Sequence, residues 1–146
     1  MYLDNKISVA VIAHNEESNI SECINSIIKQ SIEPDEIVVI THNCEDRTEE
    51  IVSKFEDKRI KLISYRGEYG TGPARKKAFE SVHNELVACI DGDAIASKHW
   101  LKYLLLPFIK KNSVNVVSGV SMFKGFYWFF SSINFFFIKT VFYKQK

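Results

Sequence analysis

The chain has 146 residues, of which 46% are hydrophobic and 25% are charged, the balance of a soluble globular protein with one sizeable core. The formal net charge of +1 hides an asymmetry: residues 1–93 hold all 18 acidic residues and 11 of the 19 basic ones, whereas residues 94–146 hold eight lysines and no acid. The apolar run near the N-terminus is short and has acidic residues on both sides, which excludes a signal peptide or a membrane span there.

Along the chain, apolar runs alternate with segments whose apolar residues recur at helical spacing. The runs rich in β-branched residues predict strands over 7–13, 36–41, 59–65, 85–91 and 114–123. The helical spacing predicts helices over 15–30, 45–57 and 97–111. Residues 66–82 are expected to form a glycine-rich loop that continues into a further helix. Because strands that alternate with helices form right-handed βαβ units, the predicted fold class is α/β. We expect a Rossmann-like, parallel sheet with a mixed edge, flanked by helices.

Polar clusters follow the predicted strands at their carboxyl ends, where ligands bind in open parallel sheets. The four clusters are His14-Asn15-Glu16, Thr41-His42-Asn43, Arg66 to Gly72 and Asp91-Gly92-Asp93. In the last cluster, two carboxylates one residue apart offer hard oxygen ligands to Mg²⁺ or Mn²⁺, with water or phosphate completing the coordination. Gly92 would let a bulky ligand approach the backbone. The alternative for this tripeptide is an ordinary Asp-Gly turn.

The glycine-rich loop, GEYGTGPARKK, is typical of a loop that cradles phosphate groups, because flexible backbone precedes a helix start and basic side chains. The spacing of a P-loop or of a dinucleotide-binding fingerprint is absent. Arg75 is the expected functional cation, whereas Lys76 or Lys77 is expected to be solvated. The alternative is a turn followed by a solvated basic helix face.

Two histidines, His14 and His42, end neighbouring predicted strands and are expected to face each other. A histidine metal site would need a third ligand that the sequence does not supply, so the rim of a base-binding pocket is favoured. The three cysteines show no CxxC spacing, which indicates free, mostly buried thiols in a reducing compartment. Cys44 and Cys89 are expected to pack rather than to react, because neither has a clear activating base.

Together the clusters resemble the family 2 glycosyltransferases, inverting enzymes of the GT-A fold. ISVAVIAHNEESNISECINSI resembles the opening strand and helix of that family, and PDEIVVITHNCEDRTEEIVSKF resembles its second strand and following loop. GTGPARKKAFE is similar to the Gly-x-x-x-Ala-Arg element, and ELVACIDGDAIASKHWLKYLL to the Asp-x-Asp strand with the helix that follows. The match runs in order over about residues 6–121, and four ordered elements are far more specific than any one alone.

The resemblance implies a nucleotide-sugar donor and a divalent cation, Mg²⁺ or Mn²⁺. It implies that Arg75 approaches the diphosphate and that Asp91 and Asp93 hold the metal. The implied substrate-binding residues are Ala13, His14, Asn15, Glu16, Thr41, His42, Arg75 and Asp91.

The sequence departs from the family in two places. Thr41-His42 stands where the family usually has an acid that contacts the base, so uracil and guanine both remain open. The family also needs a carboxylate general base after the Asp-x-Asp motif, and this chain has no Asp or Glu after Asp93. We therefore expect a donor-binding half, truncated after the Asp-x-Asp motif, that binds donor but transfers sugar slowly.

The C-terminal segment is aromatic and basic: 11 of the 19 aromatic residues fall between Phe123 and Tyr143. Residues 125–138 are too short for a span, which needs about 20 apolar residues, but suit an amphipathic helix at a membrane interface. A helix that packs on the sheet or on a partner is the alternative. The predicted organisation is a nucleotide-sugar-binding domain over 1–122 and a segment over 123–146 that contacts an anionic membrane or a partner protein.

Three functional hypotheses follow from the sequence. The first is a glycosyltransferase donor domain in the cytoplasm, peripheral to the membrane, that does not bind nucleic acid. The second is a non-catalytic nucleotide-sugar-binding module at a membrane or on a partner subunit. The third is an unrelated Rossmann-like protein, which the four-element match disfavours.

Overall fold

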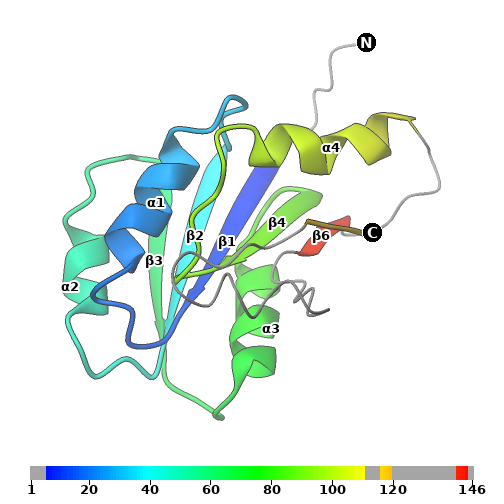
Figure 1. The fold of residues 1–146 in the computed structure, drawn as a ribbon. Coiled ribbons are helices and arrows are strands. Elements are labelled where there is room, and N and C mark those ends of the chain that lie inside the picture. Colours follow the sequence, from blue (N-terminus) through cyan, green and yellow to red (C-terminus); the bar gives the residue numbers. More distant parts are fainter. Residues whose placement is uncertain (1–5, 111–115, 120–140, 145–146) are drawn as a thin grey trace, which may run out of the picture.

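The structure is a computed structural model that describes residues 6–110, 116–119 and 141–144. Strands and helices alternate through most of this part of the chain (Figure 1). The strands are β1 (Ile7–Ala13), β2 (Glu36–His42), β3 (Ile60–Tyr65), β4 (Leu86–Asp91), β5 (Val116–Ser118) and β6 (Val141–Lys144). The helices are α1 (Ile20–Ile28), α2 (Thr48–Ser53), α3 (Thr71–Ser81) and α4 (Trp100–Lys110).

The strands form a sheet with the order β3-β2-β1-β4-β6-β5. The pairs β1–β2, β2–β3 and β1–β4 are parallel, whereas β6 runs antiparallel to both β4 and β5. The predicted α/β fold with a parallel sheet, a mixed edge and flanking helices is therefore confirmed.

Helices cover both faces of the sheet (Figure 1), and the two faces have separate cores. On one face, α1, α2 and α4 pack through residues such as Ile20, Ile24, Val52 and Leu101. On the other face, α3 packs through the small residues Ala74 and Ala78 against β1, β2 and β4. Side chains of a strand alternate between the faces, so each position near the end of a strand is assigned to one helix layer or the other.

The mixed edge differs from the predicted elements. A strand was expected over 114–123, but the described strand there is only Val116–Ser118, and it pairs with β6 rather than with β4. The neighbour of β4 is Val141–Lys144, which belongs to the predicted C-terminal segment. Four residues of that segment thus belong to the same sheet as β1–β4, while the helix expected over 125–138 lies outside the described residues.

Helix limits are also shorter than the apolar spacing suggests. The helix expected from residue 15 begins at Ile20, and the helix expected over 45–57 covers Thr48–Ser53. Both differences arise because residues 14–17 and 43–47 form loops that hydrogen-bond to each other, as described below. Among the described residues, none forms a helix of the length and apolarity needed to cross a membrane.

Candidate nucleotide-binding site

The carboxyl ends of β1, β2 and β4 lie side by side because these strands pair in parallel register. Ile12 is the register partner of Asp91, and Ala13 is the partner of Thr41. Alternation along the strands places Ile12 on the α3 face, together with neighbouring core residues of β2 and β4. By the same alternation, His42 and Asp91 face α3, whereas Thr41 faces α2.

A pocket of about 130 Å³ lies between the ends of β1 and β2 and the beginning of α3. Its lining consists of Ile12, His14, His42, Tyr69, Gly70 and Thr71. The two histidines that the sequence predicted to face each other are brought together here, with ring centroids 6.4 Å apart. Tyr69 was missed by the sequence reasoning. It is 81% exposed beside the pocket, and an aromatic residue within the glycine-rich loop was the available signal.

Arg75 and Asp91 meet at the carboxyl end of β4. The Arg75 Nη2 atom donates a hydrogen bond to Asp91 Oδ1 at 3.2 Å, and the two side chains are 39% and 24% exposed. A half-exposed ion pair of this kind contributes little to stability, so both groups remain available to a ligand. The ion pair thus connects the glycine-rich element with the Asp-x-Asp motif, which are separate motifs in the sequence.

The Asp-x-Asp motif, Asp91-Gly92-Asp93, packs against Glu16, since a Cβ atom at Gly92 would lie 3.3 Å from Glu16 Cγ. All three acids raise the pKa of the Cys23 thiol, although burial makes the largest contribution and brings that pKa to about 12. Within the described part of the chain, no cluster of three or more His, Cys, Asp or Glu side chains could hold a metal by itself. Two hard carboxylates fit Mg²⁺ or Mn²⁺ if the ligand's phosphates and water complete the coordination.

Gly92 has a different role from the one expected. It is buried, and its N–H donates to the carbonyl of Ile12 at 2.7 Å. A Cβ atom at this position would lie 3.0 Å from Ala13 Cβ and 3.3 Å from Ala13 Cα. A larger residue would crowd Ala13, because the motif packs directly against the end of β1 between its two carboxylates.

The loops after β1 and β2 are tied together by hydrogen bonds. Asn15, with a positive φ of 53°, accepts the N–H of Glu45 on its side-chain oxygen at 2.8 Å. The N–H of Glu16 donates to Thr48 Oγ1 at 2.8 Å, and the N–H of Glu17 donates to Asp46 Oδ2 at 2.9 Å. The side chain of Asn15, predicted to lie beside the nucleotide, therefore supports the loop, whereas the Glu16 carboxylate accepts a hydrogen bond from Asn19 Nδ2 at 2.9 Å.

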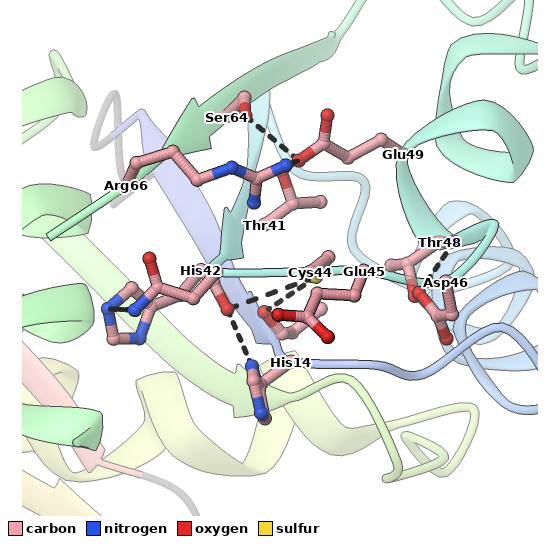
Figure 2. Close-up of polar contacts among 12 residues, drawn as sticks. His14, Thr41, His42, Cys44, Glu45, Asp46, Thr48, Glu49, Ser64 and Arg66 are labelled. Carbon is pink, nitrogen blue, oxygen red and sulfur yellow. Dashed lines mark hydrogen bonds and ion pairs between the residues drawn. The ribbon is translucent and has the colours of Figure 1, made fainter. Parts of the chain in front are cut away.

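Thr41 lies at the end of β2 as predicted, but its side chain is fully buried on the α2 side. Glu49 Oε1 accepts hydrogen bonds from Thr41 Oγ1 at 3.1 Å and Ser64 Oγ at 2.8 Å, and forms an ion pair with Arg66 Nη2 at 3.1 Å (Figure 2). Glu49 of α2 is thus the acid that contacts the end of β2. It anchors the beginning of the glycine-rich loop and is not part of the pocket lining.

The cysteines are free and buried, as the sequence indicated. Burial raises the pKa of Cys89 to about 12 and also raises the pKa of Cys44. Because only the thiolate is a nucleophile, these residues serve packing and not chemistry at neutral pH.

The lysines after Arg75 are not among the residues that line the pocket of His14 and His42. Lys76 is exposed, with its Nζ 3.9 Å from Glu80 Oε1. Lys76 and Lys77 line another groove, of about 620 Å³, between α3 and the end of β3, with Tyr65, Gly67 and Glu68 on its other side. The expectation that Arg75 is the basic side chain directed at the site agrees with this arrangement.

A parallel sheet covered on both faces, with polar clusters and a pocket at its carboxyl edge, places the chain among the open α/β proteins that bind ligands at that edge. The chain matches the family described as glycosyl transferase family 2 over residues 8–146. It therefore belongs to glycosyl transferase family 2, and its fold is the GT-A fold of that family.

Individual relatives agree with this assignment. The chain is 29% identical over 116 residues to the Escherichia coli UDP-Glc:alpha-D-GlcNAc-diphosphoundecaprenol beta-1,3-glucosyltransferase WfgD, covering 80% of this chain and 46% of WfgD. It is 36% identical over 109 residues to an uncharacterized glycosyltransferase of Haemophilus influenzae, covering 73% of this chain and 33% of that protein. The chain thus spans less than half the length of these relatives.

Solved structures show the same fold. S. aureus TarS in complex with UDP matches with a TM-score of 0.67 and 30% identity, covering 82% of this chain and 37% of TarS. The mannosyltransferase PcManGT from Pyrobaculum calidifontis, solved with GDP-Man and Mn²⁺, matches with a TM-score of 0.75 and 20% identity, covering 96% of this chain and 44% of PcManGT. At that identity, the second match concerns the fold alone.

Proposed function

We propose that this chain is the donor-binding part of a glycosyltransferase that takes a sugar from a UDP- or GDP-linked donor with the help of a divalent cation. The observation that carries this proposal is the meeting of Arg75 with Asp91 at the carboxyl edge of the sheet, beside the pocket. A guanidinium and a carboxylate pair at that position can receive a diphosphate and its cation together. The bound UDP and UDP-GlcNAc of TarS, a relative at 30% identity, support a nucleotide-sugar ligand.

The roles of the residues follow from their chemistry. Arg75 would bind a diphosphate oxygen through a charge-assisted hydrogen bond, and its contact with Asp91 directs the guanidinium toward the motif. Asp91 and Asp93 would hold Mg²⁺ or Mn²⁺, which when bound would neutralise charge on the leaving diphosphate. Ala13 and Glu16 pack against Gly92, between the two carboxylates.

The base of the donor would occupy the pocket that His14 and His42 line. Asn15 and Thr41 would act through the loops that they support, because their side chains are engaged in hydrogen bonds to the protein. The predicted contact of residues 123–146 with an anionic membrane or a partner protein stays a prediction from composition, since only 141–144 of that segment are described.

Calorimetric titration of the 146-residue chain with UDP and with GDP, each with Mn²⁺ or with a chelator, tests the proposal. We expect one of the two nucleotides to bind with Mn²⁺ and to bind much more weakly with the chelator. Absence of binding to both nucleotides in both conditions would remove the donor function.

Arg75→Ala tests the diphosphate role. A charge-assisted hydrogen bond contributes about 1.5–3 kcal/mol, so the affinity for the nucleoside diphosphate should fall by about tenfold to a hundredfold. The affinity for the nucleoside alone should change little. Lys77→Ala is the matched control, because it removes a cation from the same helix that lines the larger groove and not the pocket of His14 and His42. Equal losses in the two variants would show that the general charge of α3, and not Arg75, attracts the ligand.

A further inference from the structure

The pocket holds two histidine rings whose hydrogen bonds determine which nitrogen carries the proton. His14 Nδ1 lies 2.7 Å from the backbone oxygen of His42 (Figure 2). A carbonyl oxygen only accepts hydrogen bonds, so Nδ1 of His14 must be the donor. In the neutral ring the other nitrogen, Nε2, then has a lone pair and can only accept. His14 is exposed beside the pocket, so this edge of its ring is accessible to a ligand.

The second ring, His42, is already committed to the protein. The N–H of Gly67 donates to Asn43 Oδ1 at 3.1 Å, and Asn43 Nδ2 donates to the oxygen of Gly67 at 3.0 Å, which fixes the orientation of the amide. The same Nδ2 lies 3.1 Å from His42 Nε2, which therefore accepts. The ring of His42 also stacks on Tyr65 at a centroid distance of 5.2 Å and is only 4% exposed. His42 is thus a fixed wall whose Nε2 is occupied.

Glu49, the carboxylate that is hydrogen-bonded to Thr41, does not act as an acceptor in the pocket. Glu49 Oε1 is engaged by Thr41, Ser64 and Arg66 on the α2 side of the sheet. Glu49 is also not a lining residue of the pocket. Among the residues that line the pocket, His14 is therefore the one with an accessible ring nitrogen, Nε2, that acts as a hydrogen-bond acceptor.

We propose that His14 selects the donor's base by accepting a hydrogen bond at Nε2 from a ring N–H, and that the base is uracil. Uracil carries a hydrogen on N3, whereas cytosine has a lone pair at the same position, which would face the lone pair of Nε2. The pocket, about 130 Å³, is smaller than the roughly 300 Å³ or more of sites that enclose a whole ligand, and this size fits a single pyrimidine ring. This inference rests on the proposed donor function.

The test compares UDP with CDP, because the two differ only in the base edge that His14 would read. In calorimetric titrations with Mn²⁺, we expect the 146-residue chain to bind UDP about tenfold to a hundredfold more tightly than CDP, the usual penalty of an unpaired polar group. His14→Asn keeps an amide N–H that can donate to the His42 carbonyl but lacks the acceptor at the Nε2 position. His14→Phe keeps the ring and removes both nitrogens.

Both variants should bind UDP and CDP with affinities within about threefold of each other, since only the base preference is lost. His99→Phe serves as the control, because His99 lies at the beginning of α4, where it contacts Ser31 and Tyr103 and not the pocket. It should keep the full preference, and circular dichroism of each variant would verify the fold.

The possible outcomes distinguish a failure of the base preference from a failure of the proposed donor function. A chain that binds GDP but neither UDP nor CDP would overturn the assignment of uracil alone, whereas a chain that binds none of the three nucleotides would overturn the proposed donor function as well. A wild-type chain that binds UDP and CDP equally would overturn the base preference alone. The same holds if His14→Asn and His14→Phe fold and retain the preference for UDP.

Discussion

In the presence of Mn²⁺, the Asp91→Asn variant should bind UDP about 100-fold more weakly than the wild-type chain, or weaker still. Loss of an outer-shell partner of a metal ligand already lowers metal affinity by about 10- to 100-fold, and Asp91 is proposed to be a direct ligand. Asp93→Asn should show the same loss. Calorimetric titration with UDP at saturating Mn²⁺ measures the effect.

When the metal is removed, the Asp91→Asn substitution should no longer weaken the binding of UDP. Asp91 faces the proposed diphosphate site and holds Arg75 at 3.2 Å. With a chelator present, Asp91→Asn removes a negative charge that would repel the diphosphate and releases the guanidinium to bind it. We therefore expect the variant to bind UDP at least as tightly as the wild-type chain under those conditions. Glu80→Gln, an exposed acid on α3, is the control and should leave both affinities unchanged. A loss of the same size with and without Mn²⁺ would contradict the metal role.

Sugar transfer by the 146-residue chain should be slow, at a rate about 10²–10⁴-fold below that of an enzyme with its general base in place. The acids at the site are Glu16, Asp91 and Asp93, and these are assigned to the donor and its cation. No Asp or Glu follows Asp93 in the sequence, so no carboxylate from that part of the chain can deprotonate an acceptor. Slow hydrolysis of the donor by water should remain, because the leaving group would still be activated.

The measurement is the release of nucleoside diphosphate with and without a sugar acceptor, using UDP-linked donors. Glu68→Gln is the informative variant, because Glu68 lies in the glycine-rich loop and is exposed near the site. We expect it to leave the residual rate unchanged. Transfer at about 1 s⁻¹ or faster, a rate typical of enzymes, would refute the expectation, and a loss of that rate in Glu68→Gln would identify the base. A chain that binds donor without any turnover would instead match the alternative of a non-catalytic binding module.

Much of the site was predictable because local patterns determine where parallel strands end. The apolar runs predicted β1 to β4, and their carboxyl ends carry the polar clusters that the structure brings to one edge of the sheet. The sequence also favoured Arg75 over Lys76 and Lys77 as the cation of the site; the structure shows its contact with Asp91, while its role toward a ligand stays a prediction.

The sequence by itself determined the fold class, the family and the placement of the polar clusters at one sheet edge, because hydrophobic periodicity and motif order are local properties. Tertiary structure alone decided that Thr41 faces α2 while His42 lines the pocket, since alternation separates them but only helix packing shows which face holds the site. It also decided that Gly92 packs on Ala13 and that Val141–Lys144 lies beside β4. Those contacts join residues far apart in the chain, and such pairing is set by the complementarity of surfaces that no local pattern encodes.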